Sequence, residues 1–200
     1  MHGMVNRGLQ SYVRTIFSFE LWEDVCTQAG LSFFNFETML TYDDEVTDRI
    51  IDAIAQQLSR SREEILEDFG TFVVAEKDHS AVRRLLRFGG EDYVEFLFSL
   101  EDVHDLASVV LPELDVPRFE LTAHDETSYT LDYRFEKVGF GAVFLGLLRA
   151  MADDYGALVL IDHHPQSGQN ADRDRFDIQV LHLGWPDQAM DDHAGLELVQ

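Results

Sequence analysis

The sequence predicts a domain of the α+β class, with helices in the first half of the chain and an antiparallel sheet in the second. Apolar residues recur at helical spacing as far as about Val110, and short runs of alternating polarity follow Pro112. A length of 200 residues suits one domain with a sizeable core. Helices that are segregated along the chain from paired strands are typical of the α+β class.

About six helices are expected before the first strand. The clearest apolar repeats, every three or four positions, fall within residues 5–17, 46–58 and 92–110. A further helix is expected to begin near Ser61, because Ser61 and Glu64 have the spacing of a capping box.

Four strands and one helix are expected in the second half. Tyr129, Leu131 and Tyr133 alternate with polar residues, which places them on one face of a strand. The expected elements are strands at 118–122 and 128–133, a helix at 139–155, and strands at 157–161 and 176–181, with a polar loop at 163–175.

The composition argues against several classes of function. Asp and Glu outnumber Lys and Arg by 38 to 15, and a formal net charge of −23 repels nucleic acid and anionic membranes. The one cysteine, Cys26, permits neither an internal disulfide nor a cysteine-rich zinc site. The sequence has no signal peptide and no apolar run long enough to span a membrane, so we expect a cytoplasmic location.

His104 is the most informative histidine. Helical spacing places it on one stripe with Leu97, Leu100 and Ala107. A buried imidazole needs a partner for its ring nitrogens. Periodicity alone leaves two interpretations open: a hydrogen-bonded histidine of the core, or an axial ligand of a metal or of haem.

Other patterns do not indicate chemistry. His163 and His164 are adjacent, and no third metal ligand follows at useful spacing, so we interpret them as part of a solvated loop. Gly139 and Gly141 lack the third glycine and the βαβ context of a dinucleotide-binding loop. No catalytic triad is legible and no carboxylate pair stands out, so the sequence does not indicate an enzyme.

Several segments, in order, resemble the haem–nitric oxide/oxygen binding (H-NOX) family, in particular its bacterial stand-alone type. The likeness begins at MHGMVNRGLQ and continues through Tyr42–Thr47, Leu100–His104, Pro117 and Leu145–Leu148. It extends from Met1 to about Leu181. The order and spacing of these segments are more specific than any one of them.

The resemblance implies the H-NOX fold and a haem site. A single domain would occupy residues 1–185, with a distal helical subdomain at 1–60 and a proximal subdomain with a four-stranded antiparallel sheet at 61–185. Residues 186–200 would form an acidic, flexible tail. His104 would be the axial ligand of the iron of haem b, and Pro117 would press on the haem face.

The propionate-binding motif departs from the family. The family has Tyr-x-Ser-x-Arg, whereas this chain has Tyr133, Phe135 and Lys137 at the three positions. Lys137 keeps the charge but loses the two-pronged geometry of a guanidinium, and Phe135 loses the hydroxyl. Arg134 would point to the opposite face from Tyr133. Propionate anchoring would therefore be weaker, unless these residues simply form the end of a strand.

The resemblance also assigns the gas-binding side of the haem. Met4, Val143 and Phe144 would line an apolar distal wall, although core packing explains each of them equally well. Oxygen is retained by a hydrogen-bond donor, whereas nitric oxide binds ferrous haem strongly without one. Since no hydroxyl stands at Val143 or Phe144, the resemblance implies a sensor of nitric oxide.

Signalling in this family is switching rather than catalysis. Nitric oxide would weaken the iron–His104 bond, and the two subdomains would rotate relative to each other. The signal would pass in trans to a histidine kinase or a cyclic-di-GMP enzyme, whose basic residues would face the acidic surface. The alternative is a haem-free protein-interaction or ligand-binding module on the same scaffold, which the altered motif favours.

Overall fold

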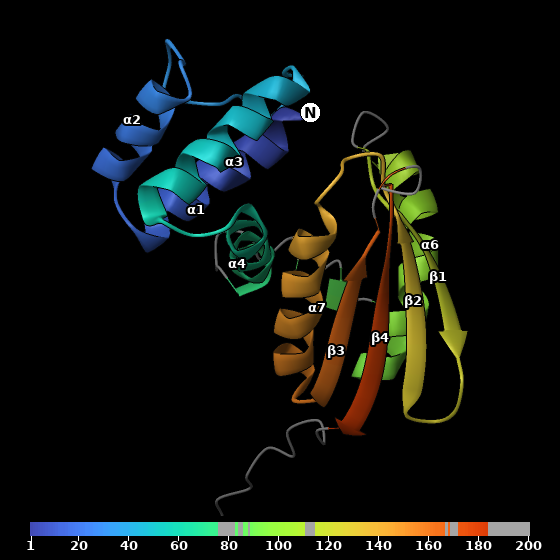
Figure 1. Ribbon diagram of the computed structural model, residues 1–200. Coiled ribbons are helices and arrows are strands. Elements are labelled where there is room, and N and C mark those ends of the chain that lie inside the picture. Colours follow the sequence, from blue (N-terminus) through green and yellow to red (C-terminus); the bar gives the residue numbers. More distant parts are fainter. Residues whose placement is uncertain are drawn as a thin grey trace, which may run out of the picture.

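The computed structural model describes residues 1–75, 83, 86–87, 89–110, 115–166, 168 and 172–183, so the expected acidic tail lies outside the described residues. Within them the chain is α+β, as expected (Figure 1). The strands form one antiparallel sheet in the order β1-β2-β4-β3. The elements are α1 (Gly3–Ile16), α2 (Phe19–Gln28), α3 (Asp44–Leu58), α4 (Arg62–Ala75), α6 (Tyr93–Val110), β1 (Arg118–Ala123), β2 (Ser128–Arg134), α7 (Gly141–Tyr155), β3 (Leu158–Pro165) and β4 (Arg173–His182).

The capping box that the sequence predicts is formed at the start of α4. The Ser61 amide donates to Glu64 Oε2 at 2.7 Å, and the Glu64 amide donates to Ser61 Oγ at 3.2 Å. These bonds satisfy two amides that a helix start leaves without a partner. The local sequence therefore fixes where α4 begins.

Two apolar cores lie in the molecule. The first is built by α1, α2 and α3, with Trp22, Ile50 and Ile54 fully buried. The second lies between the sheet and helices α6 and α7. Helix α4 contributes to both cores. Its Phe69 belongs to the first, which we call the helical core, and its Val74 belongs to the second, which we call the sheet core. None of the helices in the described ranges combines the length and apolar character needed to cross a membrane.

Two glycines bring α4 and α7 into close contact. A Cβ at Gly70 would lie 1.9 Å from the Val143 carbonyl oxygen, and a Cβ at Gly146 would lie 1.9 Å from the Glu67 carbonyl oxygen. Neither position has room for a side chain, because such distances are far below van der Waals contact. This contact holds α7 between the two cores.

The expected polar loop at 163–175 is shorter than predicted. Strand β3 continues to Pro165 and β4 begins at Arg173, so His163 and His164 belong to a strand. The His163 side chain is buried, lies 3.2 Å from the Asp174 carboxylate, and stacks on Phe176 at 4.7 Å between ring centroids. Our interpretation of His163 as part of a solvated loop is therefore wrong, whereas His164 is exposed.

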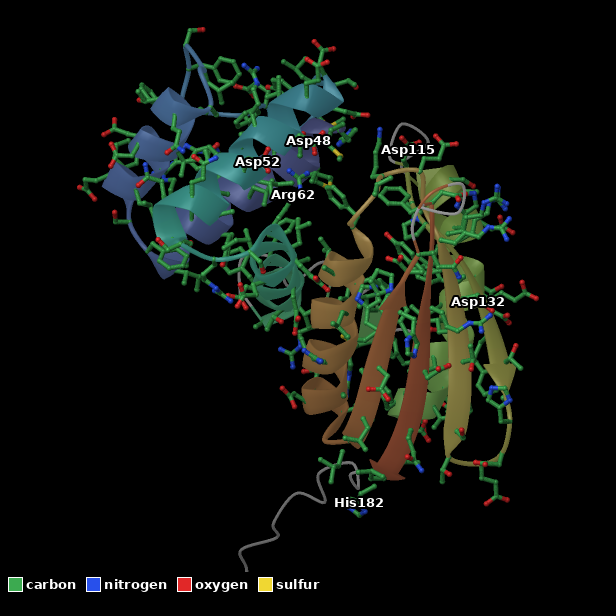
Figure 2. All side chains as sticks on the ribbon, in the orientation of Figure 1. Asp48, Asp52, Arg62, Asp115, Asp132 and His182 are labelled. Atoms are coloured by element: carbon green, nitrogen blue, oxygen red, sulfur yellow. The ribbon has the colours of Figure 1, made fainter. Side chains whose placement is uncertain are left out.

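The two faces of the sheet differ in character. Tyr129, Leu131 and Tyr133 face the sheet core, and alternate residues face outward. Figure 2 shows Asp132 among the side chains that project from this outer face. Helix α6 contacts β1, where the Leu121 amide donates to Glu101 Oε1 at 3.0 Å. The alternation predicted from the sequence is thus observed in β2.

Candidate functional site

His104 lies in the second half of α6 and is half-buried. Its Nδ1 atom is 2.9 Å from the carbonyl oxygen of Val116. A carbonyl oxygen can only accept, so Nδ1 carries the proton and Nε2 of the neutral ring keeps a free lone pair. Histidines that bind metals usually have one ring nitrogen fixed in this way. The arrangement therefore suits a metal ligand, and it also satisfies one nitrogen of a structural histidine.

An apolar cavity of about 210 Å³ lies beside α6. Five of the eight residues that the sequence singled out line it, namely Pro117, Tyr133, Phe135, Val143 and Phe144. Its volume is below the roughly 300–1,000 Å³ of typical cofactor pockets. The structure therefore brings most of the expected haem-contacting residues together, around a space smaller than haem requires.

Aromatic rings occupy much of this region. Phe144 is buried, stacks on Tyr133 with 5.7 Å between centroids, and lies 4.5 Å from Phe119. Phe135 packs edge-on against both Tyr133 and Phe140. Burial raises the pKa of Tyr133, and the charge of Asp174 raises it further. The altered motif thus contributes to an aromatic cluster.

Three of the expected residues lie outside the cavity wall. His104 borders two polar clefts, of about 550 and 430 Å³, rather than the apolar cavity. Its neighbours on α6, Leu100 and Val103, do line the cavity. Met4 is 37% exposed on α1 and does not line this cavity. The third residue is Lys137.

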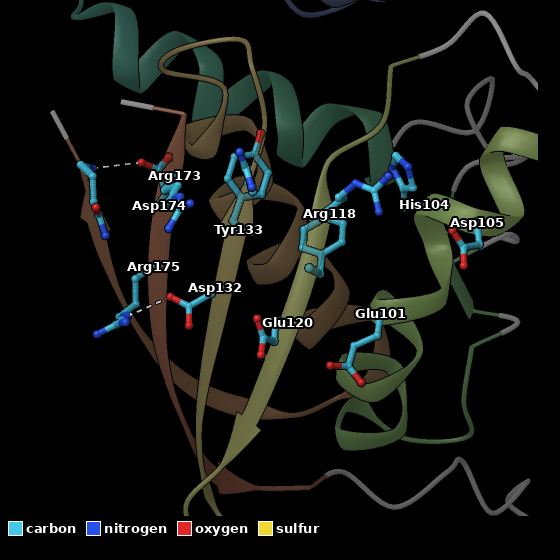
Figure 3. Close-up of a pocket in the computed structure, with 13 residues that line it drawn as sticks. Glu101, His104, Asp105, Arg118, Glu120, Asp132, Tyr133, Arg173, Asp174 and Arg175 are labelled. Atoms are coloured by element: carbon cyan, nitrogen blue, oxygen red, sulfur yellow. Dashed lines mark hydrogen bonds and ion pairs between the residues drawn. The ribbon is translucent and has the colours of Figure 1, made fainter. Parts of the chain in front are cut away.

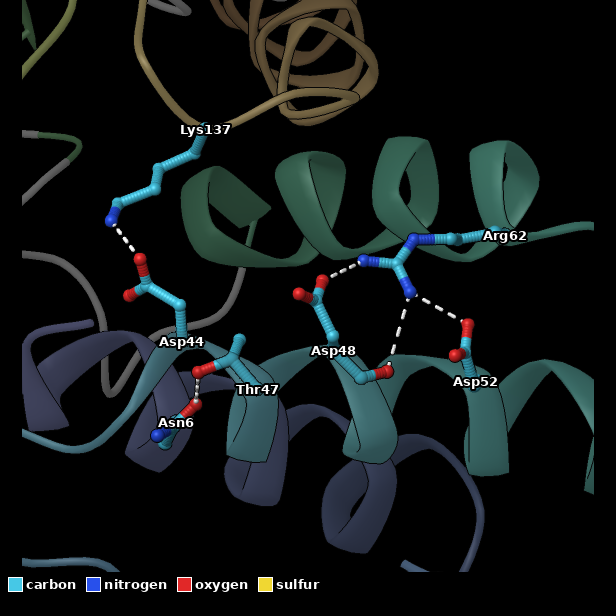
Figure 4. Close-up of polar contacts among 7 residues, drawn as sticks. All are labelled: Asn6, Asp44, Thr47, Asp48, Asp52, Arg62 and Lys137. Atoms are coloured by element: carbon cyan, nitrogen blue, oxygen red, sulfur yellow. Dashed lines mark hydrogen bonds and ion pairs between the residues drawn. The ribbon is translucent and has the colours of Figure 1, made fainter.

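Lys137 binds a carboxylate of the chain itself. Its ammonium group donates to Asp44 at the start of α3 (Figure 4). The Met1 amino group donates to the same carboxylate at 2.6 Å. These two hydrogen bonds, with that from Lys137 the larger cause, hold the pKa of Asp44 below its ordinary value. Lys137 therefore connects the segment before α7 to the helical core.

The position of His163 could have been predicted from the alternation of the sequence around it. Val159, Ile161 and His163 alternate, and this alternation continues the inner face of β3. A Cβ at Gly141 would lie 1.6 Å from Asp174 Oδ2 and 3.0 Å from His163 Nε2, so only glycine fits there. Among the residues that the structure describes, no group of three or more His, Cys, Asp or Glu side chains could hold a metal ion.

Comparison with known proteins gives one consistent result. The family model described as Haem-NO-binding matches residues 2–163. Soluble guanylate cyclase 89Da of Drosophila melanogaster is 23% identical over 158 residues, which cover 79% of this chain and 24% of that protein. Soluble guanylate cyclase gcy-31 of Caenorhabditis elegans is 21% identical over 154 residues, which cover 77% and 22%. The chain thus spans about a quarter of the length of these cyclases.

Solved structures show the same likeness. The Fe(II) unliganded H-NOX protein from K. algicida has a TM-score of 0.79 and 17% identity, and the match covers 94% of this chain and all of that one (100%). The H-NOX protein from S. oneidensis in the Fe(II)NO state has a TM-score of 0.77 and 17% identity, and the match covers 91% and 100%. At these identities the likeness establishes a shared fold.

Proposed function

This chain belongs to the haem–NO-binding (H-NOX) family, and from that premise we propose that it is a haem-based gas sensor in which His104 binds the iron. The observation that carries the proposal is the hydrogen bond from His104 Nδ1 to the Val116 carbonyl oxygen, at 2.9 Å. This bond fixes the tautomer with a free lone pair on Nε2, as an axial ligand requires. H-NOX domains are sensor modules, and we assign this chain no catalytic role.

The residues of this chain suit the iron of haem better than they suit its propionate groups. His104 supplies a neutral imidazole, and Pro117 and Val103 supply apolar contacts nearby. Haem, when bound, supplies an iron that binds a diatomic gas. Tyr133 remains available for a propionate, whereas Lys137 is already bound to Asp44. Entry of a haem-sized group requires the rings of Phe135 and Phe144 to move apart.

The cavity wall favours nitric oxide over oxygen. Val143 and Phe144 lack hydrogen-bond donors, and Tyr133, which has the only hydroxyl group in the wall as the structure describes it, is assigned above to a propionate rather than to the bound gas. Oxygen bound to iron needs such a donor for retention, whereas nitric oxide does not. We therefore assign nitric oxide as the sensed gas.

Helix α6 can transmit a movement of His104. The same helix presents Glu101, which accepts the hydrogen bond from Leu121 of β1. A ligand that favours one position of His104 would therefore also favour one arrangement of α6 and β1. We propose that the surface formed by α6 and β1 passes the signal to a separate histidine kinase or cyclic-di-GMP enzyme. If basic residues of that partner face the acidic surface, binding weakens as salt rises, and an affinity indifferent to salt would exclude this contact.

A haem-free module on the same scaffold is the second candidate. The small cavity favours it, as does the contact between Lys137 and Asp44. In this case the aromatic cluster would be ordinary core packing, and His104 would be a hydrogen-bonded structural residue. The two candidates differ in one measurable property, which is haem binding.

The absorption spectrum of freshly purified protein, before and after reconstitution with haem, separates the candidates. The sensor is expected to show a Soret band that shifts when nitric oxide is added. His104→Ala is expected to lose that band or to shift it strongly. His124→Ala is the matched control, because His124 is an exposed histidine on the β1–β2 hairpin.

Three outcomes would decide against the sensor. The first is no Soret band after reconstitution. The second is a band that His104→Ala leaves unchanged, since the ligand would then be another residue. The third is equal loss in the His124 control, because the loss would then not be specific to His104. The first of these outcomes would support the haem-free module.

A further inference from the structure

Three arginines lie side by side on the outer face of the sheet. Arg118 of β1 pairs in register with Arg134 of β2, and Arg134 pairs with Arg173 of β4. All three side chains are exposed. Neighbouring strands are about 4.8 Å apart, so the row spans roughly 10 Å between its outer Cα atoms.

Such a row is unfavourable unless an anion compensates it. Like charges directly opposite each other on neighbouring strands repel. Arg134 is compensated in part, because its Nε lies 3.1 Å from the Asp172 carboxylate. Arg118 and Arg173 make no ion pair or hydrogen bond with any residue of the described ranges. The chain has only 15 Lys and Arg against 38 Asp and Glu, so three adjacent arginines run against its composition.

The row borders the cleft of about 550 Å³, which we call the arginine cleft (Figure 3). His104 lies at its α6 side, and Gln166 lies beyond β4 at the other end of the row. This volume falls in the range of roughly 300–1,000 Å³ that is typical of small-molecule sites. The cleft therefore suits a small molecule better than a protein surface.

Five carboxylates also border the arginine cleft, and they limit where an anion can lie; they belong to Glu101, Asp105, Glu120, Asp132 and Asp174. Asp132 is compensated by Arg175, whose Nε lies 3.1 Å away. Glu101 is engaged with the Leu121 amide. Glu120 is two positions along β1 from Arg118, or about 7 Å. An anion is therefore favoured at the arginine row and disfavoured further along the sheet.

We propose that the arginine cleft binds a small molecule that carries two or more phosphate groups, such as a nucleoside diphosphate or triphosphate. A guanidinium binds phosphate through two parallel hydrogen bonds, which an ammonium group cannot do. One phosphate can be shared by two neighbouring arginines, and a second is needed to reach the third. The occupant would lie beside His104, although the proposal does not depend on haem.

Calorimetric titration of the full chain with ATP, pyrophosphate and AMP, at constant ionic strength, tests the proposal. ATP and pyrophosphate are expected to bind saturably, and AMP at least about tenfold more weakly, because it has one phosphate. Arg118→Gln with Arg173→Gln is expected to weaken pyrophosphate binding by about tenfold or more. Arg49→Gln is the matched control, since Arg49 is an exposed arginine on α3.

Several results would overturn the proposal. One is the absence of saturable binding of both ATP and pyrophosphate at millimolar concentration. Another is equal weakening by Arg49→Gln, which would indicate non-specific attraction. A third is tighter binding of a hexaglutamate peptide than of pyrophosphate, which would assign the cleft to an acidic protein segment. Arg118→Gln with Arg173→Gln separates this proposal from the haem proposal, because it should weaken pyrophosphate binding and leave the Soret absorption of the wild type unchanged.

Discussion

The two sides of the junction between α6 and β1 are built from different chemistry. One side is the apolar cavity, where Phe144 and Phe135 pack ring against ring. The other is the arginine cleft, where the row of three arginines lies beside a row that contains Glu120 and Asp132. Tyr133 and Phe119 border both. A single strand pair thus separates a region that stabilises the fold from one that is free to recognise a ligand.

Replacement of Phe144 is expected to show the largest effect on the apolar side. Phe144→Ala should lower the free energy of unfolding by about 3–5 kcal/mol, as for other buried Phe-to-Ala changes. The ring contacts Tyr133, Phe119 and Phe176, so its loss leaves a larger cavity. Urea unfolding measures the stability. If haem binds here, the same variant should take up haem faster on reconstitution.

Phe98→Ala is the control for this prediction. Phe98 lies on α6 like His104, but it is 48% exposed and makes one edge-on contact, with Tyr129. Its removal is expected to cost less than about 1.5 kcal/mol, because little apolar area is lost. Equal costs for the two variants would contradict the assignment of the apolar side as the stabilising one.

The apolar side could be predicted from the sequence better than the charged side. Helical spacing placed His104 beside Leu100, and strand alternation placed Tyr133 inward; both placements depend on local periodicity. The motif departures at Phe135 and Lys137 were also legible. The contact that Lys137 makes in place of a propionate could not be predicted, because it joins Lys137 to Asp44, 93 positions away in the sequence.

The arginine row shows why the rest was not predictable. The expected hairpin could align Arg118 with Arg134, because a short loop fixes the register of the two strands. Arg173 comes from β4, whose register against β2 depends on tertiary packing, and the sequence indicated a loop at that position. His163 was not assigned to a strand for the same reason, because it also falls within the expected loop. Polar residues at strand ends weaken the alternation by which strands are recognised.

The contact between Lys137 and Asp44 should have a smaller effect that depends on pH. Lys137→Met is expected to cost about 0.5–1 kcal/mol at neutral pH, because the Asp44 side chain is 49% exposed and solvent screens the pair. Lys137 lowers the pKa of Asp44 from its ordinary value of 3.8. The contribution is therefore present above pH 3.8 and is lost as pH falls through the lowered pKa.

Urea unfolding of both proteins between pH 7 and pH 2.5 tests this dependence. The difference between them should be constant near neutral pH and shrink as pH falls below 3.8. Arg149→Met is a suitable control, since Arg149 binds Glu67 between α7 and α4 and does not touch Asp44. A difference that does not shrink between pH 7 and pH 2.5 would mean that the aliphatic part of Lys137, and not its charge, stabilises the fold.

Tyr133 stands on the boundary between the two sides, and its hydroxyl group should have the smallest effect. The described structure shows no hydrogen bond from this hydroxyl, so Tyr133→Phe is expected to change stability at pH 8 by less than about 0.5 kcal/mol.

Burial, with the charge of Asp174, raises the pKa of Tyr133 above the ordinary 10.0. As pH rises past 10, an unfolded tyrosine ionises while the folded one stays neutral, so wild-type stability falls. Tyr133→Phe removes this loss, and at pH 10.5 it should be more stable than wild type by about 0.8 kcal/mol. A cost above about 1 kcal/mol at pH 8 would instead show that the hydroxyl has an acceptor in solution.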